Sequence, residues 1–136
     1  MLSQYYNHET IGTLILFLSE ASLKQNCIVP VYCFMPDHLH FMLAGQQEQS
    51  DLKKAVINFK QKSGYWFSQN AKEVQLQKGF YDHLHWKDHS ITNHIRYILE
   101  NPVRKEIVSE WNQYPYSGSI GVDLFDVLGG KPINKT

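Results

Sequence analysis

Hydrophobic positions along the chain follow two different periods, which together predict a mixed α+β domain. Apolar residues recur at helical spacing in three segments, 9–24, 51–68 and 91–101. Three shorter runs are β-branched, aromatic or alternating, as is typical of strands: 28–34, 38–43 and 79–86. The turn residues Met35-Pro36-Asp37 join the first two strands into a hairpin. The order helix, hairpin, helix, strand, helix predicts a small antiparallel-type sheet with helices packed on it.

The rest of the pattern adds detail without adding a second domain. Pro30 lies inside the first predicted strand, where its missing N–H favours a sheet edge or a bulge. After Val103 the pattern weakens, apart from a turn at 114–118. The chain shows no internal repeat, low-complexity tract or Pro/Gly-rich linker. We therefore expect a single domain over residues 1–136.

The composition is that of a folded domain rather than of a fibrous, disordered or membrane-spanning chain. Of the 136 residues, 43% are hydrophobic and 13% aromatic, with 8 Gly and 5 Pro. No apolar run approaches the ~20 residues of a spanning helix, and the N-terminus lacks the layout of a signal peptide. Cys27 and Cys33 are too few for a disulfide framework and are expected to be reduced core residues. These features predict a cytoplasmic protein.

The charge balance limits the ways in which the chain could bind nucleic acid. The 13 Lys and Arg equal the 13 Asp and Glu, so the formal net charge is zero. Coating of nucleic acid by bulk charge depends on the neutralisation of phosphates, so the balance argues against that class and leaves a local basic surface open. Histidine is the one unusual count, with 7 in the chain.

Two histidines of the second predicted strand, His38 and His40, carry the clearest chemistry. Side chains at i and i+2 of a strand share a face, so both imidazoles project together, about 7 Å apart along the strand. Leu39 and Phe41 then point to the opposite face. Two imidazoles so placed can converge on one divalent metal. The alternative is two polar residues on the wet face of a half-buried sheet.

The predicted helix 91–101 carries a second candidate group. His94, Tyr97 and Asn101 fall in one arc beside the buried stripe, and Tyr97 and Asn101 are one turn apart. A phenol nucleophile needs help with its high pKa, and the bond that it attacks needs its charge neutralised. A metal held by two histidines and a side-chain oxygen supplies both. The alternative is a boundary tyrosine that packs its ring and exposes its hydroxyl.

Further candidates would contact the substrate. The run Tyr81-Asp82-His83-Leu84-His85 contains groups suited to metal or acid–base chemistry, although such local pairs are usually surface hydrogen bonds. We expect Tyr81 and His83 to have a structural or substrate-contact role. The basic residues of the helices and of the segment after them either grip DNA phosphates or are ordinary solvated side chains: Lys53, Lys60, Arg96, Arg104 and Lys105.

Four segments, taken in order, carry a resemblance to a known family. They are Phe34–Leu43 with its Met-Pro-Asp-His-Leu-His core, Phe59-Lys60, Gly79–His83 and Tyr97–Arg104. A closing segment follows, with Trp111 and Tyr114-Pro115-Tyr116-Ser117. Over about residues 10–118, the chain resembles the IS200-like transposases and their chromosomal relatives, the REP-associated tyrosine transposases.

The resemblance implies a single-tyrosine, histidine–hydrophobe–histidine endonuclease and strand transferase on a ferredoxin-like sheet. It implies that His38 and His40 bind Mg2+ or Mn2+, with Asn101 as a third metal-facing side chain. Tyr97 would be the nucleophile that forms a 5′-phosphotyrosine intermediate. The implied partner is single-stranded or hairpin DNA in a bacterial cytoplasm, with no membrane. Relatives of the insertion-sequence type form dimers and chromosomal relatives can act as monomers, so the resemblance leaves both a homodimer and a monomer open.

Two features depart from the family pattern. Asp37 stands where Asn is commoner in the motif. The family sequence begins with a strand, whereas residues 1–9 offer no β pattern, so we expect that strand to be missing and a sheet edge to be unpaired.

Two other functions stay open. One is a catalytically inactive, hairpin-DNA-binding remnant of such a transposase. The other is an unrelated metal hydrolase with a water nucleophile, which would use His38, His40 and His83, with His85 as a further candidate.

Overall fold

The computed structural model describes residues 8–36, 38–70, 81–84 and 91–129, and for 81–84 it describes the backbone alone. In chain order the elements are α1 (His8–Lys24), β1 (Cys27–Met35), β2 (His38–Met42), β3 (Ala44–Gly45), α2 (Leu52–Asn70), β4 (Tyr81–Leu84), α3 (Ile91–Leu99), α4 (Asn101–Arg104), a 3-10 turn (Trp111–Gln113), β5 (Ser117–Ile120) and α5 (Leu124–Leu128). The predicted α+β class, the hairpin and the three main helices are confirmed.

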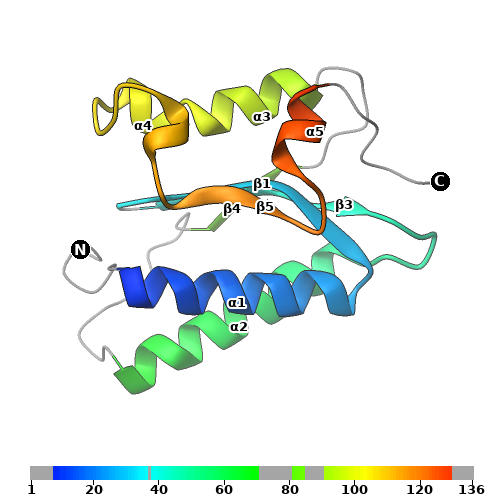
Figure 1. Cartoon of the computed structure of the whole chain (residues 1–136). Helices are drawn as coiled ribbons and strands as arrows, with labels where there is room; N and C mark the ends of the chain where they lie inside the picture. The colour runs from blue at the N-terminus through cyan, green and yellow to red at the C-terminus, as the bar shows by residue number, and fades with distance from the viewer. Residues whose placement is uncertain (1–7, 37, 71–80, 85–90, 130–136) are drawn as a thin grey trace.

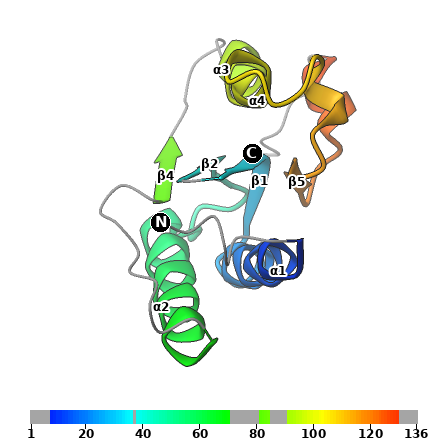
Figure 2. The same ribbon diagram turned by 90° about the vertical axis from the view of Figure 1, so that its left-hand side faces the viewer.

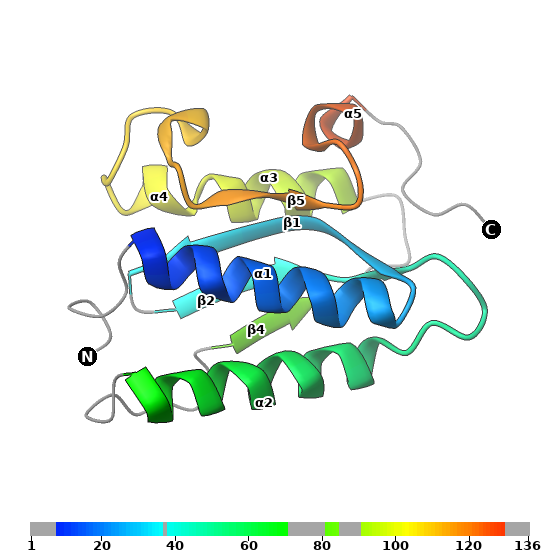
Figure 3. The ribbon, with the colours of Figure 1, turned by 60° about the horizontal axis from the view of Figure 1, so that its bottom comes forward.

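One sheet separates the helices into two layers. α1 and α2 lie against one face, and α3, α4 and α5 lie over the other (Figures 1 and 2). α1 and α2 run side by side and contact each other along their length (Figure 3). Each layer has its own buried cluster, because the strands present apolar side chains to both faces.

The sheet is mixed rather than wholly antiparallel. Four strands are ordered β3-β1-β2-β4, and β5 pairs with β1. The antiparallel hairpin places Cys33 opposite His40 and Met35 opposite His38. β4 runs parallel to β2, with Asp82 opposite His40. The outer edge of β2 is therefore paired, and β4 is the last strand on that side in the order of the described strands.

We expected the first strand of the family to be missing from residues 1–9. Most of this segment, residues 1–7, lies outside the described residues. From His8 onward the chain is already helical. β4 pairs with β2, the strand that carries the histidines, so this strand is not left at the edge of the sheet.

β1 changes the face that its side chains present near Pro30. Val29 packs into the cluster beneath α1 and α2, whereas Val31 and Cys33 pack into the cluster beneath α3. The pairing of β1 with β5 shifts register between Val29 and Tyr32. The bulge predicted from Pro30 is thus confirmed, while the alternative of an edge strand is wrong, because β1 is paired on both sides.

Two parts of the C-terminal third differ from the sequence pattern. The helix predicted over 91–101 ends at Leu99, and a separate short helix begins at Asn101 with Pro102 in its first turn. β5 and α5 were not predicted. β5 is held to the sheet by pairing with β1, and the buried Tyr114 hydroxyl donates a hydrogen bond to the Phe34 carbonyl oxygen.

Candidate functional site

The histidine pair lies on the face of the sheet that α3 covers. Along β2, Leu39 and Phe41 are buried in the cluster beneath α1 and α2, which leaves His38 and His40 on the opposite face. Both histidines are half-buried, and their ring centroids are 4.5 Å apart with the rings nearly perpendicular. The prediction that the two imidazoles project together is confirmed.

This arrangement suits two nitrogen ligands of one cation. Ring centroids 4.5 Å apart allow a nitrogen of each imidazole to approach a common point. Within the ranges that the structure describes, no group of three or more His, Cys, Asp and Glu side chains comes together. Amide oxygens, water and substrate oxygens, which Mg2+ and Mn2+ favour, could complete the coordination of such a cation.

Tyr97 lies on α3, above the same face of the sheet. α3 packs on β1 through Ile95, Ile98 and Leu99, which are buried with Cys33 and Met35. Tyr97 is on the outer side of this helix and is 61% exposed. Its ring is therefore not buried in the core.

The Tyr97 ring is covered by a guanidinium group. Arg104 Cζ lies 3.9 Å from the centroid of the Tyr97 ring, which is the geometry of a cation–π contact. Arg104 Nη2 also donates a hydrogen bond of 2.8 Å to the Tyr97 carbonyl oxygen. That carbonyl is in the last turn of α3, where backbone oxygens lack donors within the helix.

Arg104 also joins Tyr97 to Asn101. The same Nη2 atom donates to Asn101 Oδ1. The helix break at Glu100 thus places three side chains, Tyr97, Asn101 and Arg104, in one cluster at the junction of α3 and α4. The prediction that Tyr97 and Asn101 lie close together is confirmed by their shared partner.

Both helices of the junction contact β1, the strand that is paired with the histidine-bearing strand β2. Burial raises the pKa of the Cys33 thiol to about 12, and the Arg104 guanidinium acts in the opposite direction. Cys33 is the cross-strand partner of His40 and shares its face of the sheet. The Tyr97 cluster and the two histidines therefore belong to the same side of the sheet, the side that α3 covers.

The predicted DNA-contacting residues are more widely spread. Lys53 and Lys60 are both exposed on α2, in the layer on the other side of the sheet. Tyr81 and His83 belong to β4, at the edge beside β2, where the backbone alone is described. Arg104 is thus the one predicted phosphate contact that the described side chains bring to Tyr97. His85 lies outside the described residues.

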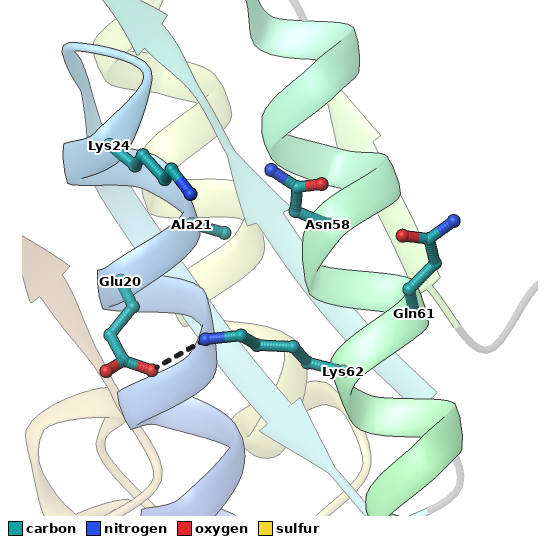
Figure 4. A pocket seen from close by; sticks show the side chains of 6 residues that line it. All are labelled: Glu20, Ala21, Lys24, Asn58, Gln61 and Lys62. Carbon is teal, nitrogen blue, oxygen red and sulfur yellow. Dashed lines mark hydrogen bonds and ion pairs between the residues drawn. The ribbon is translucent and has the colours of Figure 1, made fainter.

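The pocket between α1 and α2 is remote from these groups. It has a volume of 390 Å³, and its lining residues include Glu20 and Lys62, which form an ion pair of 3.3 Å (Figure 4). Because both helices cover the face opposite the histidines, this pocket does not belong to the candidate site.

The chain matches the model of the family described as Transposase IS200 like over residues 3–98. The chain belongs to the IS200-like transposase family. The part matched by the family model contains His38, His40 and Tyr97 and ends before Asn101. Among the described residues, no helix is both long and apolar enough to cross a membrane.

A curated relative supports the same family. A Haemophilus influenzae protein named as a REP-associated tyrosine transposase is 24% identical in an alignment of 115 positions, and the alignment covers 74% of this chain. The aligned part spans 65% of that protein's length. No solved structure matches the chain.

For this member of the IS200-like transposase family, sequence reasoning identified Arg104 only as a candidate for phosphate binding. Its contacts with Tyr97 and Asn101 were missed. Two signals point to them: the i, i+3 spacing of Asn101 and Arg104, and Pro102, which interrupts the helix and leaves carbonyl oxygens without donors.

Proposed function

We propose that this transposase cuts and rejoins single-stranded DNA through a covalent bond to Tyr97. The observation that carries the proposal is the pairing of His38 and His40 on the face of the sheet above which the Tyr97 helix lies. Membership of the IS200-like family supports it, because the matched part contains all three residues.

The two imidazoles would hold Mg2+ or Mn2+. Such an ion, when bound, polarises the scissile phosphate and offsets the charge that develops on it. The resemblance also proposes Asn101 as a metal-facing side chain. In the structure, its Oδ1 accepts a hydrogen bond from Arg104.

The proposed reaction begins at the Tyr97 hydroxyl. As this hydroxyl loses its proton, its oxygen forms a bond to the phosphorus, and the bond from phosphorus to the 3′ oxygen breaks. The leaving 3′ oxygen takes up a proton. The products are a 5′-phosphotyrosyl strand and a free 3′-hydroxyl, and attack by another 3′-hydroxyl reverses the steps and joins strands.

The exposed position of Tyr97 allows two ways of bringing its hydroxyl to a histidine pair. A ring that is 61% exposed on the outer side of α3 can turn toward the histidines of its own chain or enter the site of a second copy. The proposal therefore includes both a monomer, in which Tyr97 serves its own histidines, and a homodimer, in which it serves those of the second copy. Hairpin DNA would contact the exposed cations and the β4 edge, through Lys53, Lys60, Tyr81, His83 and Arg104.

The experiment is incubation of the full chain with hairpin-bearing single-stranded DNA and Mn2+. A protein–DNA adduct that survives denaturant should form. It should be absent with Tyr97→Phe and unchanged with Tyr65→Phe, a matched control on an exposed tyrosine in α2. An adduct that persists in Tyr97→Phe contradicts the assignment of the nucleophile, and hairpin binding without any cleavage by the wild type favours the inactive remnant.

A second measurement tests the metal ligands. Mn2+ binding, followed by electron paramagnetic resonance, should weaken at least about tenfold with His40→Ala, since loss of a ligand costs at least what loss of its supporting partners does. His8→Ala, an exposed histidine of α1, should leave it unchanged. Equal Mn2+ affinities of the wild type and His40→Ala would contradict the histidine site.

A further inference from the structure

A pocket lies between the end of α3, the 3-10 turn and α5. It has a volume of 340 Å³, and the residues that line it are Arg96, Leu99, Glu100, Trp111 and Leu128. The two helices α3 and α5 contact each other (Figure 1). The pocket is on the same side of the sheet as Tyr97, and its volume lies in the range of sites for small ligands.

Two opposite charges of this pocket do not neutralise each other. The Glu100 N–H donates to the Arg96 carbonyl oxygen at 2.9 Å, so the two residues are one helical turn apart. Arg96 Nη2 donates instead to the Leu128 carbonyl oxygen at 3.2 Å, which uses one of the five N–H donors of the guanidinium. Within the ranges that the structure describes, no cationic side chain forms an ion pair with the Glu100 carboxylate. The pocket therefore offers an anionic acceptor and cationic donors side by side.

Apolar side chains form the rest of the lining. Leu99 is buried, while Trp111 and Leu128 are half-buried. The Phe125 ring, which is 70% exposed, contacts the Trp111 ring at a centroid distance of 6.1 Å. Flat aromatic surface next to hydrogen-bonding groups suits a ligand that is itself planar and carries polar edges.

The two charges restrict the chemistry of that ligand. A phosphate attracted by Arg96 would be repelled by Glu100, and a divalent cation attracted by Glu100 would be repelled by Arg96. An apolar ligand would cover both charges without satisfying either. A nucleobase is flat and uncharged and has donors and acceptors on its edges, so it suits the aromatic wall and both charged groups.

Guanine is the base whose edges match these groups best. Its N1–H and its N2 amine are neighbouring donors, which the two oxygens of one carboxylate can accept together. Adenine, cytosine and thymine each place an acceptor next to a donor on the corresponding edge, and that acceptor would face the carboxylate. Arginine commonly bonds to guanine through O6 and N7. Because a base pair occupies the N1 edge, the carboxylate can bind guanine only when the base is unpaired.

We propose that this pocket binds one unpaired guanine of the DNA strand that Tyr97 attacks, with Glu100 and Arg96 on the edges of the base. The inference rests on the proposed function, since it places the guanine on that strand. Tyr97 follows Arg96 directly and precedes Glu100 by three positions. Neighbours at this spacing on a helix have Cβ atoms about 5–6 Å apart. The guanine therefore lies within a few nucleotides of the attacked phosphate and selects the strand that is cut.

Binding of short oligothymidine strands that carry one guanine tests the pocket, with fluorescence anisotropy in EDTA as the measurement. The wild type should bind this strand at least about fivefold more tightly than strands with one adenine or one cytosine, which is the discrimination of one bidentate contact. Glu100→Gln should reduce the preference to less than about twofold. Glu106→Gln removes the same charge from an exposed position after α4 and should keep the preference.

Altered bases assign the two edges. Inosine lacks the N2 amine, so the wild type should bind an inosine strand more weakly than the guanine strand, and Glu100→Gln should bind both equally. A strand with 7-deazaguanine lacks N7, and the same comparison with Arg96→Gln tests the other edge. A merely structural role of either residue would change the melting temperature and the affinity for every strand, but it would leave these ratios unchanged.

The outcomes separate the pocket from the nuclease function. If the wild type prefers guanine, Glu100→Gln loses this preference and no adduct forms with Tyr97, the base pocket stands and the nuclease function does not. Equal affinities of the wild type for all strands would overturn the pocket, even if the adduct forms. Binding of guanosine monophosphate as tight as that of the guanine strand would also overturn the proposal, because the pocket would then serve a free nucleotide.

Discussion

A buried phenol adds a side-chain hydrogen bond to the backbone pairing that joins the C-terminal segment to the hairpin, and removal of its hydroxyl tests the fold. The Tyr114 hydroxyl donates to the carbonyl oxygen of Phe34, a residue 80 positions away in β1. Phe34 is opposite Leu39, which lies between the two histidines. Tyr114→Phe keeps the buried ring and its edge contact with Tyr116 and removes only the donor.

The cost of this change follows from the burial of the group. Because Tyr114 is 8% exposed, water cannot readily replace the lost donor. Loss of such a bond should lower the free energy of unfolding by about 1–2 kcal/mol. In urea, with a slope of about 2 kcal/mol per molar, the unfolding midpoint should fall by about 0.5–1 M at pH 8.

The pH dependence supplies a second, independent readout. Burial, followed by the charges of Cys33 and Tyr116, raises the pKa of the Tyr114 phenol in the folded state. The stability that this group contributes is fully present below its unfolded pKa of about 10. It is lost above that pH at up to about 1.4 kcal/mol per pH unit. Phenylalanine does not titrate, so the difference in stability between wild type and Tyr114→Phe should shrink between pH 8 and pH 11.

Urea titrations of both proteins at pH 8 and pH 11, followed by circular dichroism, measure this difference directly. The other groups whose pKa burial raises, such as Tyr32 and Cys33, are common to both proteins and largely cancel. A difference below about 0.5 kcal/mol at pH 8, the low end for a net hydrogen bond, would refute the structural role of the hydroxyl. A difference that stays constant or grows at high pH would refute the raised pKa.

Two further predictions concern packing and backbone conformation. Phe59→Ala, which empties a fully buried site of α2 against Phe41, should lower the free energy of unfolding by about 3–5 kcal/mol in urea titration, whereas Ile57→Ala on the half-exposed side of that helix should cost much less. Gly12→Ala has open space in α1 and should raise the melting temperature, since alanine is favoured over glycine by about 1 kcal/mol in a helix. Gly121→Ala should lower the melting temperature, because a Cβ there meets Ile28 at 2.7 Å and the backbone φ is 82°. Equal melting temperatures for the two glycine variants would contradict the backbone assignment.

The parts of the fold that local chemistry determines were predictable from the sequence. The hairpin follows from a proline-containing turn between two runs of strand formers, and the shared face of His38 and His40 follows from strand periodicity. The bulge follows from Pro30, which has no N–H for the ladder. Each of these features depends on neighbours within a few positions along the chain.

The remaining parts depend on contacts between distant residues. β5 consists of Ser, Gly, Ser and Ile, which gives no strand signal. It pairs with β1 where Gly118 approaches Tyr32 so closely that a Cβ would lie 2.7 Å from the phenol oxygen. The parallel pairing of β4 with β2 is likewise determined by tertiary contacts, because the periodicity of a strand does not specify its partner or its direction.

The candidate site divides in the same way. The sequence identified His38, His40, Tyr97 and Asn101 from their types and spacing. It did not show that the helix breaks at Glu100, so it missed that Arg104 reaches both Tyr97 and Asn101. The hydrogen bond from Arg104 to the Asn101 amide oxygen depends on this break, and residue spacing alone does not predict it.

Peptide mapping of the protein–DNA adduct tests the central claim most directly. Trypsin releases residues 97–104, a peptide in which Tyr97 is the one tyrosine. After nuclease digestion of the adduct formed with hairpin-bearing single-stranded DNA and Mn2+, mass spectrometry should find a 5′-phosphonucleotide on this peptide and on no other. A nucleotide attached to a different peptide, or cleaved DNA with every peptide unmodified, would contradict attack by Tyr97.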